Sequence, residues 1–178
     1  MKSALLLFAT MFLMTACSTL PPQLVNDDPA LVTDYAQWDA SQSHPVRLGG
    51  VIADVKNLDS QTRIEIVNLP ISSSGKPDIT QEPNGRYVAY VPGFVDPVSL
   101  AQGRLITTLG QSAGVEEGKV GDYLHQFPVM KQATLHLWRI EERVIVDDFG
   151  SYMFPCRGYY CRDVGYRPRE GRVIQEVK

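Results

Sequence analysis

The distribution of apolar and polar positions along the chain predicts a mainly β protein. Five segments between residues 46 and 140 either alternate apolar with polar side chains, as half-buried strands do, or concentrate β-branched and aromatic residues. We expect strands over residues 46–55, 62–69, 86–91, 104–110 and 127–140. The first two should pair, because only a short polar segment separates them. Residues 70–85 are rich in Ser, Gly and Pro, which predicts a long connection.

Glycines inside two of these strands predict curvature. Gly49 and Gly50 lie within the first strand, where such a pair favours a bulge or a sharp coil. Gly110 favours a second bulge in the fourth strand, with the strand continuing past Gln111. The acidic, glycine-containing residues from there to Gly121 are expected to form a connection.

A short helix is expected between the third and fourth strands. Asp96 suits an N-cap, Pro97 suits the first helical position and Gly103 can close the helix in the left-handed conformation. Another short helix is predicted over residues 31–38. Three strands, a helix and two strands form the element order of an OB-fold, a small five-stranded Greek-key barrel. A β-sandwich would need about seven strands and no helix, so the sequence favours an OB-like barrel.

The first residues have the pattern of a secretory signal. Lys2 precedes an apolar run over residues 4–14, which is followed by Thr15, Ala16 and Cys17. A run of this length suits a signal peptide and is far shorter than the ~20 residues that span a bilayer. The sequence LMTAC resembles a lipobox, which predicts cleavage before Cys17 and acylation of this residue. The alternative is an ordinary secretory signal that is cleaved after Ala16.

Acylation of Cys17 would place the mature protein on a membrane surface, because two or more acyl chains form a stable anchor. In lipoproteins of enteric-type bacteria, an aspartate directly after the lipidated cysteine tends to retain the protein in the inner membrane. Here this residue is Ser18. The lipobox resemblance therefore implies the outer membrane.

Four segments follow from these patterns. We expect a signal peptide over residues 1–16, a lipidated N-terminus and tether over 17–29, an OB-like barrel over 30–140 and a loop-rich tail over 141–178. The tether is inferred from its prolines, its polar residues and its lack of apolar periodicity. The tail is rich in Arg, Tyr, Phe, Gly and Pro.

Charge and cysteine content exclude some classes of protein. The chain has 17 Lys and Arg against 20 Asp and Glu, a net charge of −3, which argues against nucleic-acid binding. Cys156 and Cys161 form a C-x4-C pair, which in an oxidising compartment favours a disulfide. The alternative is a zinc half-site, but two thiolates supply only half of a tetrahedral set and His136 lies twenty residues upstream.

Several segments together resemble the Slp family of outer-membrane lipoproteins, which is named for starvation induction. They are RLGGVIADVKN, TRIEIVNLPI, GKPDI, GRYVAYVPGFVDP, GRLITTLGQSAG, FPV and LHLW. The resemblance extends from the lipobox to about Trp138 and does not include the residues after Asp147. It implies an OB-like domain that faces the periplasm and a role in stationary phase or envelope stress. It implies no established reaction and no cofactor.

The sequence shows no catalytic constellation. Nothing marks a partner for His44, His125 or His136, which we interpret as structural or surface residues. The segment AGVEEGK lacks the first glycine and the Ser/Thr of a phosphate-binding loop. The paired aspartates at 27–28 and 147–148 lack the pattern of a calcium loop. We therefore expect a non-enzymatic envelope protein without a metal.

The alternative function is a binding module that recognises a glycan, a lipid or another small envelope ligand through the barrel face or loops. Tyr87, Tyr90 and Trp138 could stack on such a ligand, although aromatic residues of a small barrel more often belong to its core. In the tail, Arg157 and Arg162 could contact the phosphates of anionic lipids. A solvated tail is the other interpretation of this segment.

Overall fold

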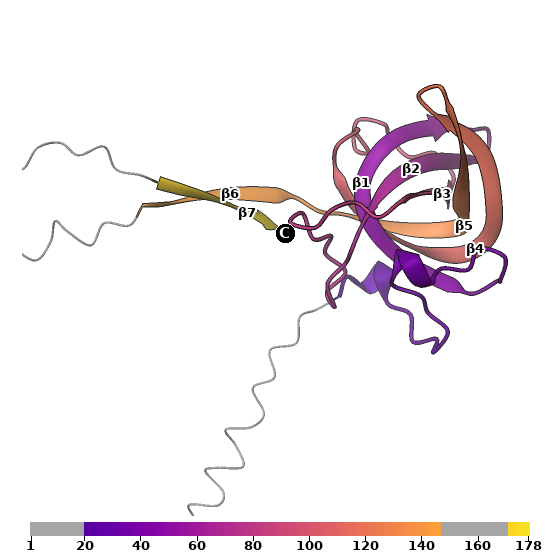
Figure 1. Cartoon of the computed structure of the whole chain (residues 1–178), viewed down its shortest axis with the longest axis horizontal. Coiled ribbons are helices and arrows are strands. Elements are labelled where there is room, and N and C mark those ends of the chain that lie inside the picture. Colours follow the sequence, from indigo (N-terminus) through magenta and orange to yellow (C-terminus); the bar gives the residue numbers. More distant parts are fainter. Residues whose placement is uncertain (1–19, 147–170) are drawn as a thin grey trace, which may run out of the picture. The chain divides into compact units, whose positions relative to one another are not determined.

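The computed structural model describes residues 20–146 and 171–178, which fall into two compact units (Figure 1). The first unit ends at Trp138 and the second consists of Arg139–Lys178. Cys17, Ser18 and most of the tail, including Cys156 and Cys161, lie outside the described residues.

The first unit is a closed five-stranded β-barrel. Its strands are β1 (Pro45–Asn57), β2 (Gln61–Leu69), β3 (Arg86–Pro92), β4 (Leu105–Val120) and β5 (Tyr123–Leu137). They follow one another around the barrel in the order β1-β2-β3-β5-β4, and β4 pairs with β1 to close it. All pairs are antiparallel except that of β3 with β5. This architecture confirms the predicted mainly β barrel.

The barrel core consists of the inward-facing residues of alternating positions. On β2, Ile64 and Ile66 are fully buried, as are Tyr87 and Ala89 on β3. Further members of the core cluster are Trp38, Val46, Leu48, Ile52, Leu100, Ile106, Met130 and Ala133. The period-2 pattern therefore identifies the inner face correctly.

The two predicted sites of curvature have different origins. The register of β1 is regular at Gly50, and the bulge lies at Ala53, between the paired residues Ile52 and Asp54. Gly50 instead allows a close approach of β1 to Val67 on β2. The bulge expected at Gly110 is confirmed by a register shift between Leu109 and Gln111.

Strand β4 is longer than predicted. Residues 112–121 were expected to form a connection, but β4 extends to Val120 and pairs with β5 as a long hairpin. Val115 lies opposite Pro128 and Val120 opposite Tyr123, so the turn consists of Gly121 and Asp122. Gly121 has a φ of 62°, which glycine adopts without strain. The apolar pattern fades here because both faces of the hairpin carry polar or exposed residues.

The helix expected between β3 and β4 is not present. Asp96 does accept a hydrogen bond from Val98 N through its side chain, at 2.9 Å, and one from Leu100 N through its carbonyl oxygen, at 3.1 Å. The segment makes only this one turn, because Gly103 N already donates to Ile52 O of β1. Within residues 31–38 the helix is limited to the 3-10 turn Tyr35–Gln37.

The N-terminal segment is packed onto the barrel from residue 20. It contains the 3-10 turn Pro22–Leu24, in which Leu24 is fully buried. Arg47 Nη1 donates to Leu24 O at 3.0 Å, and Thr134 Oγ1 donates to Gln23 O at 2.7 Å. These contacts attach residues 20–24, which were expected to belong to a free tether over 17–29, to the folded unit.

The second unit contains a hairpin that no sequence pattern indicated. Strand β6 (Ile140–Val146) pairs antiparallel with β7 (Gly171–Val177). Lys178 Nζ lies 2.9 Å from Glu141 Oε2 and holds the pKa of this carboxyl below its usual value by hydrogen bonding and charge. Both ends of the loop-rich tail are therefore paired.

Candidate binding cleft on the barrel

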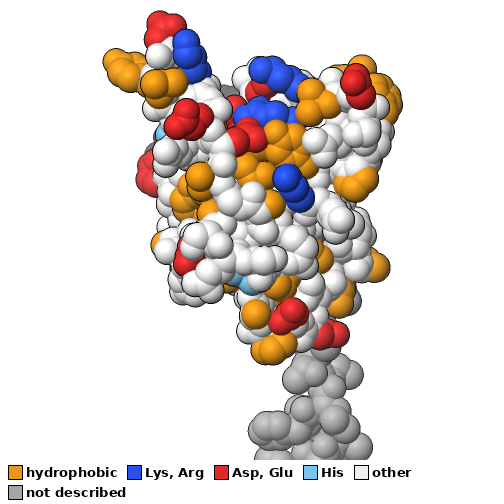
Figure 2. All heavy atoms as spheres, turned by 90° about the vertical axis from the view of Figure 1, so that its right-hand side faces the viewer, with side chains coloured by type: hydrophobic (Ala, Val, Ile, Leu, Met, Phe, Trp, Pro, Cys, Tyr) orange, Lys and Arg blue, Asp and Glu red, His pale blue; other side chains and the backbone are white. Residues whose placement is uncertain are grey.

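An open cleft of about 780 Å³ lies between the outer surface of β2 and β3 and the end of the β4–β5 hairpin. Its lining also includes the end of β1 and Gln102 from the β3–β4 loop. On the side of the molecule shown in Figure 2, basic and acidic side chains lie next to one another among apolar ones. The cleft combines groups of both charges on the outer surface of the barrel.

The floor of the cleft is a chain of ion pairs. Arg63 of β2 donates to Glu116 Oε1 from Nε at 2.9 Å and from Nη2 at 2.7 Å. Arg86 Nη1 lies 2.8 Å from Glu65 Oε1, and Arg63 Nη1 lies 3.9 Å from Glu65 Oε2. Arg63 and Glu65 share the outer face because they are two residues apart on one strand. Glu116 reaches them from β4, so the network joins the hairpin to the sheet.

Tyr90 completes this network. Its hydroxyl donates to Glu116 Oε2 at 2.7 Å, so both carboxylate oxygens of Glu116 have a partner. Burial, followed by the hydrogen bond and charge of Glu116, raises the pKa of Tyr90. Burial lowers the pKa of Arg63, but the hydrogen bond and charge of Glu116 outweigh this effect, so the net shift is upward. The guanidinium of Arg63 also lies 5.9 Å from the ring centre of the buried Phe127.

The charges that line the cleft are balanced. The basic residues are Lys56, Arg63, Arg86 and Lys119, and the acidic ones are Asp54, Glu65, Glu116 and Glu117. Arginine offers donors only and carboxylates offer acceptors only. A ligand whose groups both donate and accept, such as a sugar hydroxyl, matches this lining better than a multiply charged anion does.

A second, mainly apolar hollow of about 450 Å³ adjoins the cleft. It is lined by Val67, Pro83, Gly85, Arg86, Val120 and His125, so Arg86 and Val120 belong to both. An amphiphilic ligand could therefore place a polar part in the cleft and an apolar part beside it.

Of the three aromatic residues considered for stacking, one lies in the cleft. Tyr87 is fully buried, and its hydroxyl donates to Leu48 O at 3.1 Å. Trp138 is also buried and donates from Nε1 to Thr107 Oγ1 at 2.9 Å. The core interpretation is confirmed for both, whereas Tyr90 lines the cleft.

None of the three histidines has a hydrogen bond to the charged network, although His125 lines the apolar hollow together with Arg86. His44 Nε2 lies 3.2 Å from Asp39 O, and the ring of His125 packs on Phe127 at 4.6 Å between centres. His136 lies 2.7 Å from Gln23 Nε2, and burial lowers the pKa of its imidazole. Among the described residues no three His, Cys, Asp or Glu side chains are placed to hold a metal ion together.

No sequence signal marks the charged residues that build the cleft. Arg63 and Glu65 alternate with isoleucines on β2, a pattern that is typical of any solvent-facing strand, and β3 has only one charged residue, Arg86. Glu116 lies in the segment expected to be a connection, so nothing placed it against Arg63. The predicted contacts Arg157 and Arg162, together with Cys17, Cys156 and Cys161, lie outside the described residues. No helix in the described part of the chain is long and apolar enough to cross a membrane.

Comparison with known proteins identifies relatives over most of the chain. The family model of the outer membrane lipoprotein Slp family matches residues 14–167. This match continues well beyond Trp138, where the resemblance was expected to end, and it includes Cys156 and Cys161.

Three curated proteins are similar to the chain. An uncharacterized lipoprotein, YeaY, of Escherichia coli is 32% identical over 90% of this chain and 88% of its own length. The outer membrane protein Slp of the same bacterium is 30% identical over 81% of this chain and 79% of its own length. An uncharacterized protein of Haemophilus influenzae is 34% identical over 79% of each chain. No solved structure matches.

Proposed function

The chain belongs to the outer membrane lipoprotein Slp family, and we propose that it is a non-enzymatic, lipid-anchored binding protein of the bacterial envelope. In this proposal, acylated Cys17 holds it on the periplasmic face of the outer membrane. The cleft is the observation that supports a binding role. Its floor is a network of ion pairs that joins β2 and β3 to the β4–β5 hairpin and consists of Arg63, Glu65, Arg86 and Glu116.

The lipid anchor is supported by the sequence LMTAC and by the family match, which begins at residue 14. Replacing Cys17 with Ala should abolish acylation, because the modification needs the thiol. The measurement is labelling with radioactive palmitate, followed by fractionation of the cell envelope. Labelling that persists in Cys17→Ala would contradict the proposal.

The sorting residue allows a separate test. If Ser18 permits export to the outer membrane, then Ser18→Asp should shift the protein to the inner membrane while leaving acylation intact. Separation of the two membranes on a density gradient measures this shift. Ser18→Thr serves as the matched control and should fractionate with the outer membrane, as the wild-type protein does.

The ligand class that fits the cleft is a neutral or zwitterionic glycan of the envelope. The lining has four basic residues, which offer hydrogen-bond donors, and four acidic residues, which offer acceptors. Neutral N-acetylglucosamine oligosaccharides are suitable probes, and binding should raise the melting temperature through the linkage free energy RT ln(1 + [L]/Kd). Arg86→Lys keeps the charge beside Glu65 but loses the planar fork of arginine, so it should weaken binding. The exposed residue Lys131 lies outside the lining, and Lys131→Ala should leave the affinity unchanged.

A lipid is the second candidate, and the apolar hollow that shares Arg86 with the cleft favours it. A short-chain phospholipid distinguishes the two candidates. Stabilisation by the lipid but not by the oligosaccharides would replace the glycan proposal. Stabilisation by neither would leave a protein without this binding function.

For the tail we propose that Cys156 and Cys161 form a disulfide and that Arg157 and Arg162 contact lipid phosphates. The C-x4-C spacing in an exported chain supports the first and the arginine content supports the second. Mass spectrometry of periplasm-derived protein should show two fewer hydrogens before reduction than after it. Binding to anionic vesicles should weaken as salt is added and when both arginines are replaced by Gln.

The physiological role proposed here is support of the envelope in starvation or stationary phase. It rests on the family and on a relative named outer membrane protein Slp. A strain without the gene should take up more of a large hydrophobic dye than the parent strain does. The difference between the two strains should be larger in stationary phase than in exponential phase. Restoration by the intact gene but not by Cys17→Ala would tie the role to the anchored protein.

A further inference from the structure

The lipid anchor expected at Cys17 and the folded barrel are separated by very little chain. Only Ser18 and Thr19 lie between Cys17 and Leu20, which already packs on the barrel. A side chain added to Gly75 would meet Leu20 Cδ1 at 2.9 Å and Leu24 Cδ1 at 3.4 Å. The segment expected to act as a tether therefore shortens from thirteen residues, 17–29, to the three residues 17–19.

This spacing limits how far the barrel can lie from the bilayer. Three residue steps span at most about 11 Å even when fully extended, whereas a free chain to residue 29 would span about 40 Å. Acyl chains on Cys17 would lie in the hydrocarbon, which keeps its backbone in the headgroup layer, about 5–8 Å thick. An aqueous gap between this layer and the surface around Leu20 is then too narrow for free tumbling of the barrel.

We propose that the surface around Leu20 lies directly on the lipid headgroups and fixes the orientation of the barrel. We call it the anchor face and define it by Leu20, Gln23, Ser73, Lys76, Thr134 and His136. The inference rests on the proposed acylation of Cys17. Its occupant is the bilayer that carries the anchor.

The contacts within the anchor face suit this occupant. Gln23 Nε2 lies 2.7 Å from His136 Nδ1, and Thr134 Oγ1 donates to Gln23 O at 2.7 Å. Lys76 Nζ lies 6.0 Å from the ring centre of Trp138, which also lies beside Gly75. Apart from Leu20, the six residues carry polar side chains and one ammonium group, and none of the six carries a carboxylate. Phosphate-bearing headgroups are attracted to such a surface.

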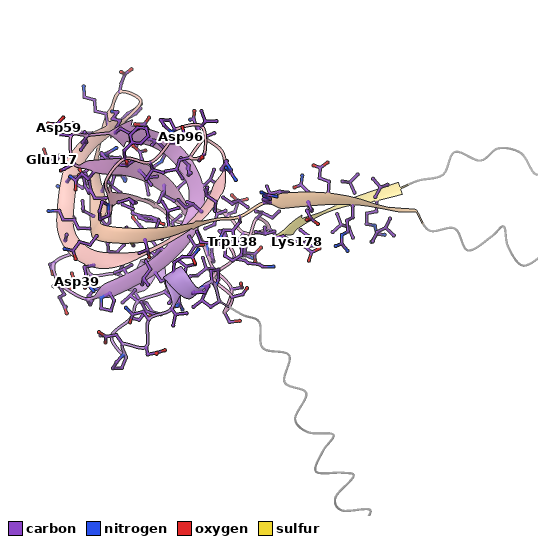
Figure 3. The ribbon with its side chains drawn as sticks, turned by 180° about the vertical axis from the view of Figure 1, so that it is seen from behind. Asp39, Asp59, Asp96, Glu117, Trp138 and Lys178 are labelled. Carbon is purple, nitrogen blue, oxygen red and sulfur yellow. The ribbon has the colours of Figure 1, made fainter. Side chains whose placement is uncertain are left out.

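The opposite end of the barrel would then point away from the membrane. Asp59, Asp96 and Glu117 mark the β1–β2 loop, the β3–β4 loop and the β4–β5 hairpin at the upper end in Figure 3, whereas the described N-terminal segment, indigo in Figure 1, lies at the lower end. In the β3–β4 loop, Phe94 is 74% exposed and Val98 is 82% exposed. The hairpin wall of the cleft would accordingly face the aqueous space, where a soluble ligand can reach it.

The test compares two positions on the acylated full-length protein. A fluorophore is attached at Ser73→Cys or at Val98→Cys in a background with Cys156→Ser and Cys161→Ser, since acylated Cys17 does not react. The proteins are reconstituted into vesicles of phosphatidylethanolamine and phosphatidylglycerol that contain a headgroup-spin-labelled lipid. Quenching at position 73 should exceed quenching at position 98 by at least about threefold. Insertion of twelve Gly and Ser residues between Thr19 and Leu20 should abolish the difference.

Each outcome is decisive. Equal quenching at the two positions, or a difference that survives the insertion, would overturn the inference. Mass spectrometry of the same samples reports acylation of Cys17 independently. An acylated protein with equal quenching refutes only the orientation, whereas an unmodified Cys17 refutes the anchor and the inference together.

Discussion

At Gly50 the backbones of β1 and β2 approach so closely that no side chain fits between them. A Cβ added there would overlap the carbonyl oxygen of Val67, a backbone atom that cannot move without breaking the β1–β2 pairing. We therefore expect Gly50→Ala to lower the free energy of unfolding by about 3 kcal/mol or more. Gly121→Ala is the control, because that site is open and only its φ of 62° is unfavourable, at about 1 kcal/mol. The measurement is urea denaturation. If the two variants lose the same free energy of unfolding, the close approach of β1 and β2 at Gly50 is contradicted.

The buried hydroxyl of Tyr87 predicts a pH dependence. Burial, only partly offset by its hydrogen bond to Thr108, raises the pKa of Tyr87 above that of an unfolded tyrosine, which is about 10. The folded state therefore keeps the proton more tightly, and its stability is full below about pH 10 and falls as the pH rises above it. Tyr87→Phe should flatten this fall in denaturation curves between about pH 9 and 11.

The same substitution has a cost at neutral pH. Without the hydroxyl, Leu48 O and Thr108 Oγ1 each lose a partner in the core, which should cost about 1–3 kcal/mol. Tyr35 and Tyr90 also have a raised pKa, so the slope should decrease rather than vanish. An unchanged slope would show that Tyr87 ionises normally in the folded protein.

At the scale of elements, the strand pattern predicted the barrel because inward positions alternate along β1, β2 and β3. The same rule failed where no core lies beneath the strands. Residues 113–120 of β4 alternate between exposed and half-buried positions without a buried apolar face, and the pair β6–β7 is largely exposed, so neither shows an apolar alternation. The cleft was missed for a related reason. Its network joins Arg63 to Glu116, 53 positions apart, and only the curl of the hairpin brings them together.

The strength of this connection can be measured with a double-mutant cycle. The Arg63 and Glu116 side chains are only 15% and 25% exposed, and two nitrogens of Arg63 contact one oxygen. We expect Arg63→Met and Glu116→Gln to be coupled by about 1 kcal/mol or more. Lys56 and Asp54 form the control pair, at 3.6 Å and 65% and 46% exposed, with an expected coupling of under about 0.5 kcal/mol. If the coupling energy of Arg63 and Glu116 is no larger than that of Lys56 and Asp54, the network does not hold the hairpin against the sheet.

The β6–β7 hairpin should open far more readily than the barrel. A two-stranded sheet is marginal by itself, and Ile140, Val144, Ile145, Val173 and Ile174 are all at least 42% exposed. Its amides should therefore exchange hydrogen faster than those of β1 and β2 by several orders of magnitude. Reduction of a disulfide between Cys156 and Cys161 should leave the exchange of the barrel unchanged. Protection of β6 and β7 equal to that of β1 would show that another surface covers them.

At the scale of the whole molecule, the boundary of the folded unit is the point where the sequence was least informative. Residues 20–29 lack apolar periodicity, yet the fully buried Leu24, the half-buried Leu20 and hydrogen bonds of Gln23 and Leu24 attach them. Leu24 fills a site that is fully closed to solvent, and its carbonyl is held by Arg47. A single buried residue produces no period, so no sequence pattern could have distinguished this segment from a free tether.

This attachment predicts where the chain can be shortened. A soluble variant that begins at residue 20 should be as stable as the complete mature chain, whereas one that begins at residue 30 loses the burial of Leu24. The loss should be about 3 kcal/mol, which lowers the melting temperature by roughly 10 °C. Leu24→Ala in the longer variant should reproduce most of this loss, and Val25→Ala, at a residue that is 50% exposed, should not. If the two variants melt at the same temperature, residues 20–29 contribute nothing to the barrel, and the anchor face loses its short connection to the membrane.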